Sequence, residues 1–426
     1  MIEVFVEQVS ERLIYTLDFI FKERDISYKI TNDLILFSKS TNIKLNYSSI
    51  NIDKICSIKP SNLLYQEQLE DNEVSLSFFN NNECLSINGI ADPLASIFYV
   101  LSRYEEYTNI KEDIHGRFLA SYSIQKENDW LDKAICDRWS ETVLEHLKCF
   151  YNVDINYNIG SVNILPTFDI DNTYAFLWKK GIRKYLSILR DRLKLDSERL
   201  SERKLVLSGD KKDPYDTFDY INSLSDRGFK VNIFWLLGGY AKYDKNISSS
   251  DTRHRDLIKK MSIKNIIGIH PSYKSNSFKN KITQERERLS TILNRGIYRS
   301  RQHFLKFNTP ITYSLLNSLG FKHEFSMGYP DEVGFRCGTA RPHFWFDLNK
   351  NQVTNLMIHP FSYMDGTLNE YMNLSIEESK KCISQLFNEV KRYGGDFVFI
   401  WHNETIGDYG KWAGWKNVLE YTLNLS

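Results

Sequence analysis

The stretch VNILPTFDID, which runs from Val162 to Asp171, indicates how the larger part of the chain folds. It is a mostly apolar run that ends in two carboxylates, Asp169 and Asp171, as expected for a buried strand with polar side chains at its C-terminal end. Further apolar runs lie at 230–237, 265–269, 297–304, 324–326, 354–358 and 396–401. Amphipathic helix patterns separate them, at 216–227, 284–294, 312–319 and 375–392. This alternation predicts a parallel sheet, here a distorted (β/α) barrel, with an open doubly wound sheet as the alternative.

The first part of the chain has a different pattern. Strand-like runs occur at 2–6, 34–37 and 74–79, and helix patterns occur at 11–22, 92–107 and 139–150. Asp92 and Pro93 suit a helix start, because Asp caps the first turn and Pro tolerates its missing N–H there. We therefore expect a smaller α/β domain of unknown role over residues 1–157 and the barrel over residues 158–426.

The overall charge is nearly balanced. The chain has 426 residues, with 55 Lys+Arg against 54 Asp+Glu, so its formal net charge is +1. This balance argues against a dedicated nucleic-acid-binding protein, which usually shows a basic excess. One segment differs: residues 179–212 hold 12 Lys/Arg and 5 Asp/Glu. It is either a solvated helical insertion or a patch that meets an anionic substrate or a membrane surface.

The N-terminus and the cysteines favour a reduced, cytoplasmic protein. The first residues, MIEVFVEQVSERL, lack the basic start and continuous apolar run of a signal peptide. No stretch reaches the roughly 20 apolar residues needed for a transmembrane helix. The six cysteines include no CxxC pair, so their spacing favours neither a disulfide framework nor a zinc ribbon.

Polar side chains recur where the predicted strands end. His270 follows the run at 265–269, His303 lies in the run at 297–304, and His402 follows the run at 396–401. Since the carboxyl ends of parallel strands meet at one edge, we expect these histidines near Asp169 and Asp171. Carboxylate oxygen and imidazole nitrogen together suit a divalent metal, most favourably Zn²⁺. An isolated Asp-x-Asp would instead indicate a turn that caps the next helix.

Four motifs carry a family resemblance. TFDID at 167–171 resembles the first motif, TFDDG, of the polysaccharide deacetylases, the NodB-homology carbohydrate esterases. IGIHPSY at 267–273, FRCGTARP at 335–342 and IWHNE at 400–404 resemble the later motifs, in the family's order. The resemblance covers about residues 160–405. It is closest to a divergent bacterial branch with an extra N-terminal domain, which DPLASIFYVLSRYEEY at 92–107 resembles.

The resemblance implies roles for individual residues. Asp169 would be the general base, Asp171 and His270 metal ligands, Arg336 the partner that orients the base, and His402 the general acid. The family's second metal-binding histidine is missing, because its position is occupied by Lys274.

Three further assignments stay open. His303 is predicted as the third ligand, and the alternative is a hydrogen-bonded histidine in the barrel mouth. Asp365 either orients His402 or forms a simple Asp-Gly turn. Near the predicted strand ends, Arg301 and several aromatic rings are candidates for substrate binding, the rings being Tyr273, Tyr329, Trp345 and Trp401.

The implied function is a metal-dependent deacetylase acting on an N-acetylated sugar or glycan precursor in surface polysaccharide metabolism. One alternative is a hydrolase of another amide or ester. The other is a non-catalytic glycan-binding protein, which the replacement of the second histidine by Lys274 favours.

Overall fold

The computed structural model describes all residues except 110, 180–188, 190–192, 194–196, 276–277 and 426. The chain forms two compact units, each made of more than one segment. Unit 1 consists of Met1–Asn163, Phe307–Ser362 and Gln385–Phe397. Unit 2 consists of Ile164–Lys306, Tyr363–Ser384 and Val398–Ser426. The units differ from the predicted continuous domains in that residues 307–362 and 385–397 belong with the N-terminal segment.

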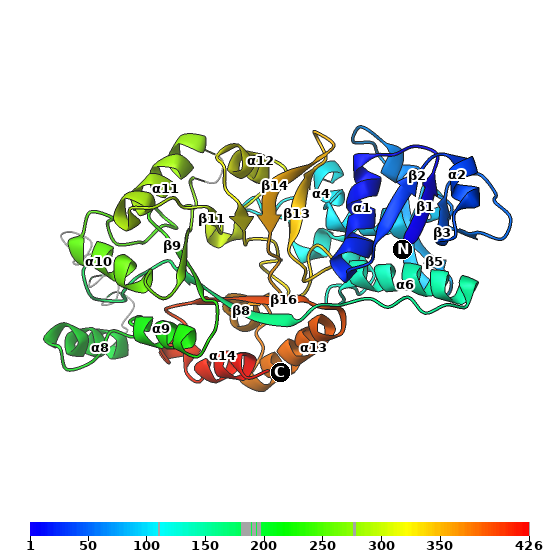
Figure 1. Cartoon of the computed structure of the whole chain (residues 1–426). Helices are drawn as coiled ribbons and strands as arrows, with labels where there is room; N and C mark the ends of the chain where they lie inside the picture. The colour runs from blue at the N-terminus through cyan, green and yellow to red at the C-terminus, as the bar shows by residue number, and fades with distance from the viewer. Residues whose placement is uncertain (110, 180–188, 190–192, 194–196, 276–277, 426) are drawn as a thin grey trace. The chain divides into compact units, whose positions relative to one another are not determined.

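Unit 1 contains a four-stranded sheet in the order β2-β1-β3-β4 (Figure 1). Its strands are parallel: β1 (Ile2–Val6), β2 (Tyr28–Thr31), β3 (Ile43–Tyr47) and β4 (Cys56–Ser57). Every residue of β1 is buried. Helix α1 (Glu11–Phe21) begins at Ser10, whose side chain accepts the N–H of Leu13 as an N-cap.

Unit 1 also contains further strands and helices. It includes the antiparallel strands β5 (Val74–Phe79), β6 (Asn82–Ile87) and β7 (Ile90–Ala91), and the helices α3 (Pro93–Leu101), α4 (Glu105–Thr108), α6 (Ile135–Tyr151) and α12 (Ile311–Ser318). Three later strands follow the order β13-β14-β12, namely β13 (His343–Asp347), β14 (Gln352–Ile358) and β12 (His323–Glu324). Phe346 and Leu348 belong to the N-terminal hydrophobic core. Through these two side chains, the segment Phe307–Ser362 contributes to the core of unit 1.

The strand predicted at 34–37 is wrong. Residues Leu34–Lys39 form helix α2. The Asp33 side chain accepts the N–H groups of Ile35 and Leu36, which starts a helix instead of a strand. Leu34, Ile35 and Leu36 are exposed, and Phe37 alone of this run is buried.

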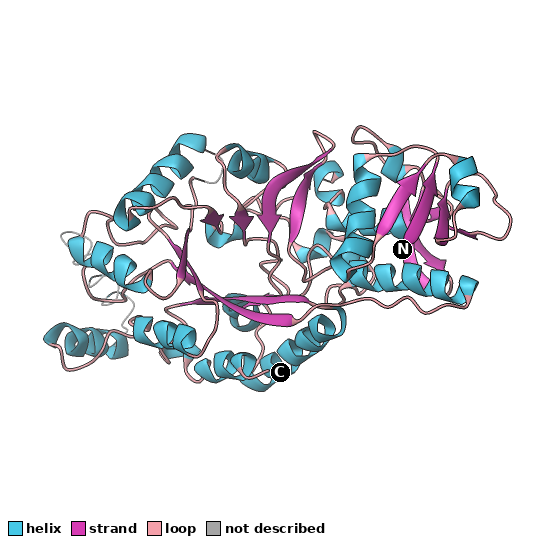
Figure 2. Cartoon of the chain, in the orientation of Figure 1, coloured by secondary structure: helices cyan, strands magenta, loops and turns pink. Residues whose placement is uncertain are grey.

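Unit 2 contains the strands that deliver the predicted site. Their order is β11-β10-β9-β8-β16-β15 (Figure 2, magenta). The bounds are β8 (Val162–Ile170), β9 (Asn232–Trp235), β10 (Ile266–Ile269), β11 (Arg299–Ser300), β15 (Tyr363–Met364) and β16 (Gly395–His402). The pairs β8–β9, β9–β10, β10–β11 and β15–β16 are parallel.

The predicted alternation of strands and helices is confirmed, but the described residues do not form a closed barrel, because the sheet is open and β15 is one of its edge strands. The helices of this part are α8 (Ser197–Ser208), α9 (Phe218–Asp226), α10 (Thr252–Met261), α11 (Lys279–Leu293), α13 (Ile376–Tyr393, shared with unit 1) and α14 (Lys416–Leu423). The strand predicted at 297–304 is reduced to β11 and a single turn at His303–Leu305.

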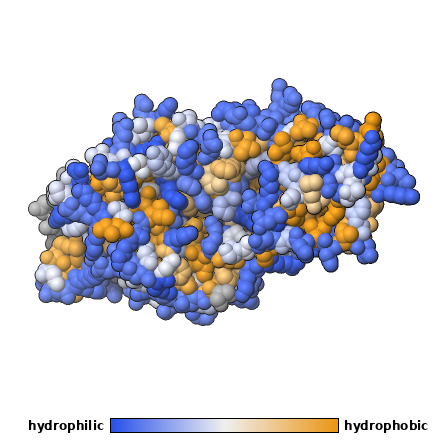
Figure 3. Space-filling model, in the orientation of Figure 1, coloured by the Kyte–Doolittle hydropathy of each residue, from blue (hydrophilic) through white to orange (hydrophobic). Residues whose placement is uncertain are grey.

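Much of the basic segment 179–212 lies outside the described residues, and its described part includes α8. The predicted contact of this segment with a membrane has no support in the structure. On the face shown in Figure 3, hydrophobic side chains form patches among hydrophilic ones. Among the described helices, none has the length and apolar character needed to cross a membrane.

Candidate metal centre and active site

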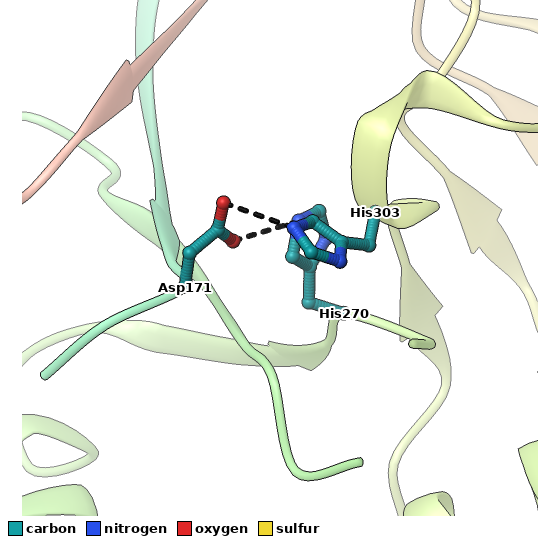
Figure 4. A group of neighbouring side chains, drawn as sticks. All are labelled: Asp171, His270 and His303. Carbon is teal, nitrogen blue, oxygen red and sulfur yellow. Dashed lines mark hydrogen bonds and ion pairs between the residues drawn. The ribbon is translucent and has the colours of Figure 1, made fainter. Parts of the chain in front are cut away.

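Asp171, His270 and His303 converge in unit 2 (Figure 4). They follow β8, β10 and β11 respectively, so three strand ends build one cluster. Nε2 of His270 lies 3.2 Å from Oδ1 of Asp171, and Nε2 of His303 lies 3.1 Å from Oδ2 of Asp171. One ligand atom from each residue lies within 4.8 Å of the other two. The structure therefore brings together the three residues predicted to be metal ligands.

The second nitrogen of each histidine has an oxygen partner. Nδ1 of His270 lies 2.6 Å from the backbone oxygen of Arg301, and Nδ1 of His303 lies 3.0 Å from Oδ1 of Asp244. Because a carbonyl and a carboxylate only accept hydrogen bonds, each Nδ1 carries its proton. Both Nε2 atoms can then offer a lone pair on the side of Asp171, as metal-binding histidines do.

The electrostatics of the cluster favour a cation. Burial opposes the charged form of His303, yet the carboxylates of Asp171 and Asp244 raise its pKa to about 10. Oδ1 of Asp171 is buried and faces Nε2 of His270. Two imidazole nitrogens and a carboxylate oxygen fit Zn²⁺ or a similar divalent metal, which would use this oxygen.

Asp169 is the second carboxylate of this region, and it lies in β8, two residues before Asp171. It is 3% exposed, and its Oδ1 lies 3.4 Å from Nη1 of Arg301. Its Oδ2 lies 3.7 Å from Nε2 of His270. Arg301 is fully buried. A fixed, buried guanidinium restricts the position of a neighbouring carboxylate.

Arg301 thus occupies the place that the resemblance implied for Arg336. The side chain of Arg336 belongs to unit 1, where Nε and Nη2 each donate to Glu106 at 2.9 Å and Nη1 donates to the oxygen of Gly328 at 3.0 Å. The guanidinium of Arg336 therefore pairs with the buried carboxylate of Glu106 and not with Asp169, as the resemblance implied. Arg301, which is also predicted to bind substrate, has a side chain with no exposed surface.

His402 and Asp365 form a pair at the adjacent strands β16 and β15. Nδ1 of His402 lies 2.8 Å from Oδ1 of Asp365, and the backbone N–H of His402 donates to Oδ2 at 2.8 Å. Thr405 also donates to this carboxylate. Burial opposes the charged form of His402, but Asp365 raises its pKa well above the ordinary value. Asp365 therefore contacts His402, and its Oδ1 also accepts the N–H of Gly366 at 2.6 Å.

The predicted aromatic platforms differ in their surroundings. Trp401 is fully buried and its Nε1 lies 3.5 Å from the hydroxyl of Tyr363, so the prediction that it stacks on a sugar is wrong. Tyr329 and Trp345 are buried in unit 1. Tyr273 is half-buried, with its ring 4.4 Å from that of Tyr243, and it stays a candidate.

Sequence reasoning missed two residues that support the cluster, Asp244 and Glu285, and it left Glu404 open between orienting a neighbour and lying at the surface. Asp244 holds His303 and also accepts the N–H of Tyr273 at 2.9 Å. Glu285 on α11 accepts the N–H and the hydroxyl of Ser272, at 2.8 and 2.6 Å, and so fixes the loop after His270. Glu404 is half-buried, and burial together with Asp171 raises its pKa to about 7. Asp244 and Glu285 stand away from the strand ends, whereas Glu404 follows β16 in the IWHNE motif.

Comparison with known proteins gives one family match, which covers only part of the chain. A family model described as "Family of unknown function (DUF7033)" matches residues 2–152, which is less than half of the chain. A search of curated proteins finds no match.

Three solved structures show the extent of the structural likeness. A candidate polysaccharide deacetylase from Mycobacterium smegmatis is 14% identical, over 64% of this chain and 87% of that chain, with a TM-score of 0.41. The polysaccharide deacetylase Bc1974 from Bacillus cereus is 11% identical, over 61% and 85%, with a TM-score of 0.28. Puue allantoinase is 10% identical, over 62% and 85%, with a TM-score of 0.37. At these values, a function for this chain has to be argued from its own side chains.

Proposed function

We propose that this chain is a metal-dependent hydrolase that removes the acetyl group from an N-acetylated sugar or glycan precursor, in surface polysaccharide metabolism. The observation that carries the proposal is the convergence of Asp171, His270 and His303 beside Asp169. A ligand set next to a separate buried carboxylate is what metal-assisted hydrolysis needs. The order of the motifs that contain Asp169, His270 and His402 supports the deacetylase assignment.

In the proposed reaction, one side chain acts as general base and another as general acid. Asp171, His270 and His303 would hold the metal, which when bound supplies Lewis-acid polarisation of the amide carbonyl and lowers the pKa of water. Asp169, held by its contact with Arg301, would take a proton from the attacking water as general base. His402, kept protonated by Asp365, would give a proton to the leaving amine nitrogen as the amide C–N bond breaks.

Metal analysis and acetate release test the proposal together. We expect the purified protein to bind about one Zn²⁺ per chain and to release acetate from N-acetylglucosamine oligomers. Asp171→Asn should lose both properties, because it removes the carboxylate that both histidines contact. The exposed Asp226, which pairs with Lys264, offers the matched control Asp226→Asn, which should keep both.

Two outcomes would contradict the proposal. A protein that binds no divalent metal and releases no acetate after reconstitution would agree with a non-catalytic glycan-binding role. Metal binding with hydrolysis of other amides or esters, and none of N-acetylated sugars, would instead indicate a different substrate class.

A further inference from the structure

Asn403, the residue after His402, is a fully buried amide that no step of the proposed reaction uses. Its Nδ2 donates to the backbone oxygens of Asn172 and Tyr215, at 3.0 and 2.9 Å, and the oxygen of Thr173 lies farther away at 3.5 Å. Since carbonyl oxygens only accept hydrogen bonds, these partners fix the orientation of the amide. Asn403 is thereby tied both to the loop after β8 and to the segment before α9.

The loop after β8 and the turn after β16 leave the sheet side by side. Strands β8 and β16 are neighbours, and the Thr167 hydroxyl donates to the backbone oxygen of Phe399 at 2.6 Å between them. β8 ends one residue before Asp171, and β16 ends at His402. Past this point, the Asn403 side chain provides a hydrogen bond between the two loops.

The segment before α9 is itself attached to the loop after β8. The buried carboxylate of Asp213 accepts the N–H groups of Ala175 and Tyr215, at 2.9 and 3.0 Å. Thr217, which directly precedes α9, donates its hydroxyl to the backbone oxygen of Asn403 at 2.9 Å. Both the side chain and the backbone of Asn403 therefore bind to a frame of connected loops.

His402 is held from two directions. Asp365 contacts its Nδ1 at 2.8 Å, so Nε2 is the nitrogen that can give a proton, and Asn403 anchors the next residue of the chain. Burial opposes the charged form of His402, and besides Asp365 the carboxylates of Asp171 and Asp169 raise its pKa. Because Coulomb interactions weaken with distance, the imidazole lies within electrostatic reach of both aspartates.

We infer that Asn403 is a positioning residue, which sets the spacing between Nε2 of His402 and the amide that reacts beside Asp171. The inference rests on the proposed hydrolase function. A general acid acts when its proton lies within hydrogen-bond reach of the leaving atom, and a displacement of about 1 Å can reduce a rate about 100-fold. Without the Asn403 amide, the turn after β16 loses its hydrogen bonds to the loop after β8.

Two acetyl substrates with different leaving groups test the inference. In an N-acetylated sugar, the amine nitrogen takes a proton from His402 as the C–N bond breaks. In 4-nitrophenyl acetate, the phenolate oxygen leaves without a proton as the C–O bond breaks. With saturating Zn²⁺, we expect Asn403→Ala to lower kcat by about 10–100-fold for N-acetylglucosamine oligomers and by less than about threefold for the ester. KM should stay unchanged, since the buried amide has no surface that a substrate could contact.

The pH profile distinguishes this role from that of Asp365. The Asp365 carboxylate stays in place in Asn403→Ala and continues to act on His402. The plateau of kcat/KM for the amide should therefore fall while its alkaline limb keeps its position. A limb that moves to lower pH would show that Asn403 acts on the protonation of His402 and not on its position.

A milder variant and a matched control accompany Asn403→Ala. Thr217→Val removes one hydrogen bond to Asn403 at nearly constant volume, so it should give a smaller loss of the same kind, and it keeps the test open if the alanine variant does not fold. Asn265→Ala is the control. Asn265 is also a buried amide, and its Nδ2 donates to the backbone oxygen of Met261 at 2.7 Å, but it precedes β10 and so lies at the opposite end of that strand from His270. Both rates should stay unchanged in Asn265→Ala.

Three results would overturn the inference while the proposed function stands. They are an equal loss of amide and ester hydrolysis in Asn403→Ala, unchanged amide hydrolysis in that variant, and the same loss in Asn265→Ala. A wild-type protein that releases acetate from neither substrate, or from the ester alone, would contradict the proposed function and this inference with it.

Discussion

Oδ1 of Asp244 lies 3.0 Å from Nδ1 of His303, on the side of the imidazole away from Asp171. This contact fixes the tautomer and the ring orientation of a predicted metal ligand. We expect Asp244→Ala to weaken metal binding by about 10–100-fold, the range typical of such partners. Asp244→Asn should weaken it less, since an amide oxygen still accepts from Nδ1. Competition with a chromogenic chelator measures the affinity, and unchanged binding in Asp244→Ala would contradict this role.

Asp365 should set the pH range over which His402 acts as an acid. Its carboxylate raises the pKa of His402 well above the ordinary value, although burial opposes the charged form. A general acid loses activity as the pH rises through its pKa. Asp365→Asn lowers that pKa, so the alkaline limb of kcat/KM should move to lower pH. The rate should fall by about 10²–10⁴-fold. Asp226→Asn serves as the control, and an unshifted alkaline limb would exclude His402 as the acid.

Arg301 and Asp169 should be energetically coupled. Arg301→Met leaves a buried carboxylate without its guanidinium, which costs about 3–5 kcal/mol of unfolding free energy. Asp169→Asn in the same chain removes the uncompensated charge, so the double variant should be less destabilised than the sum of the single variants. Urea denaturation of the four proteins gives the coupling free energy. Additive effects would show that the pair does not interact.

Gly238 should be required for the position of the loop after His270. A Cβ at Gly238 would lie 2.5 Å from Cβ of Ser272, which is far too close. Ser272 is held by Glu285 and cannot simply move away. We expect Gly238→Ala to cost about 1–3 kcal/mol and to weaken metal binding. A Cβ at the adjacent Gly239 meets no atom within 4 Å, so Gly239→Ala is the matched control. Equal stability of the two variants in urea would contradict the prediction.

Local sequence patterns were sufficient to predict most of the strands that carry the site residues. The run that ends at Asp171 forms β8, and the runs before His270 and His402 form β10 and β16. Their C-terminal polar residues could be predicted to meet, because the carboxyl ends of neighbouring parallel strands lie at one edge. The strand predicted at 34–37 was wrong, because the carboxylate of Asp33 caps the first turn of a helix there.

The sequence by itself determined the alternation of strands and helices and the polar side chains at the strand ends. Only the tertiary structure decided which partners those side chains take. Asp244 reaches His303 across 59 residues of chain, and spacing along a sequence carries no information about such a contact. Arg301, not Arg336, contacts Asp169, and Trp401 is fully buried. The physical reason is that a buried charge must be neutralised by whichever opposite charge packing brings within reach, and packing is a property of the whole fold.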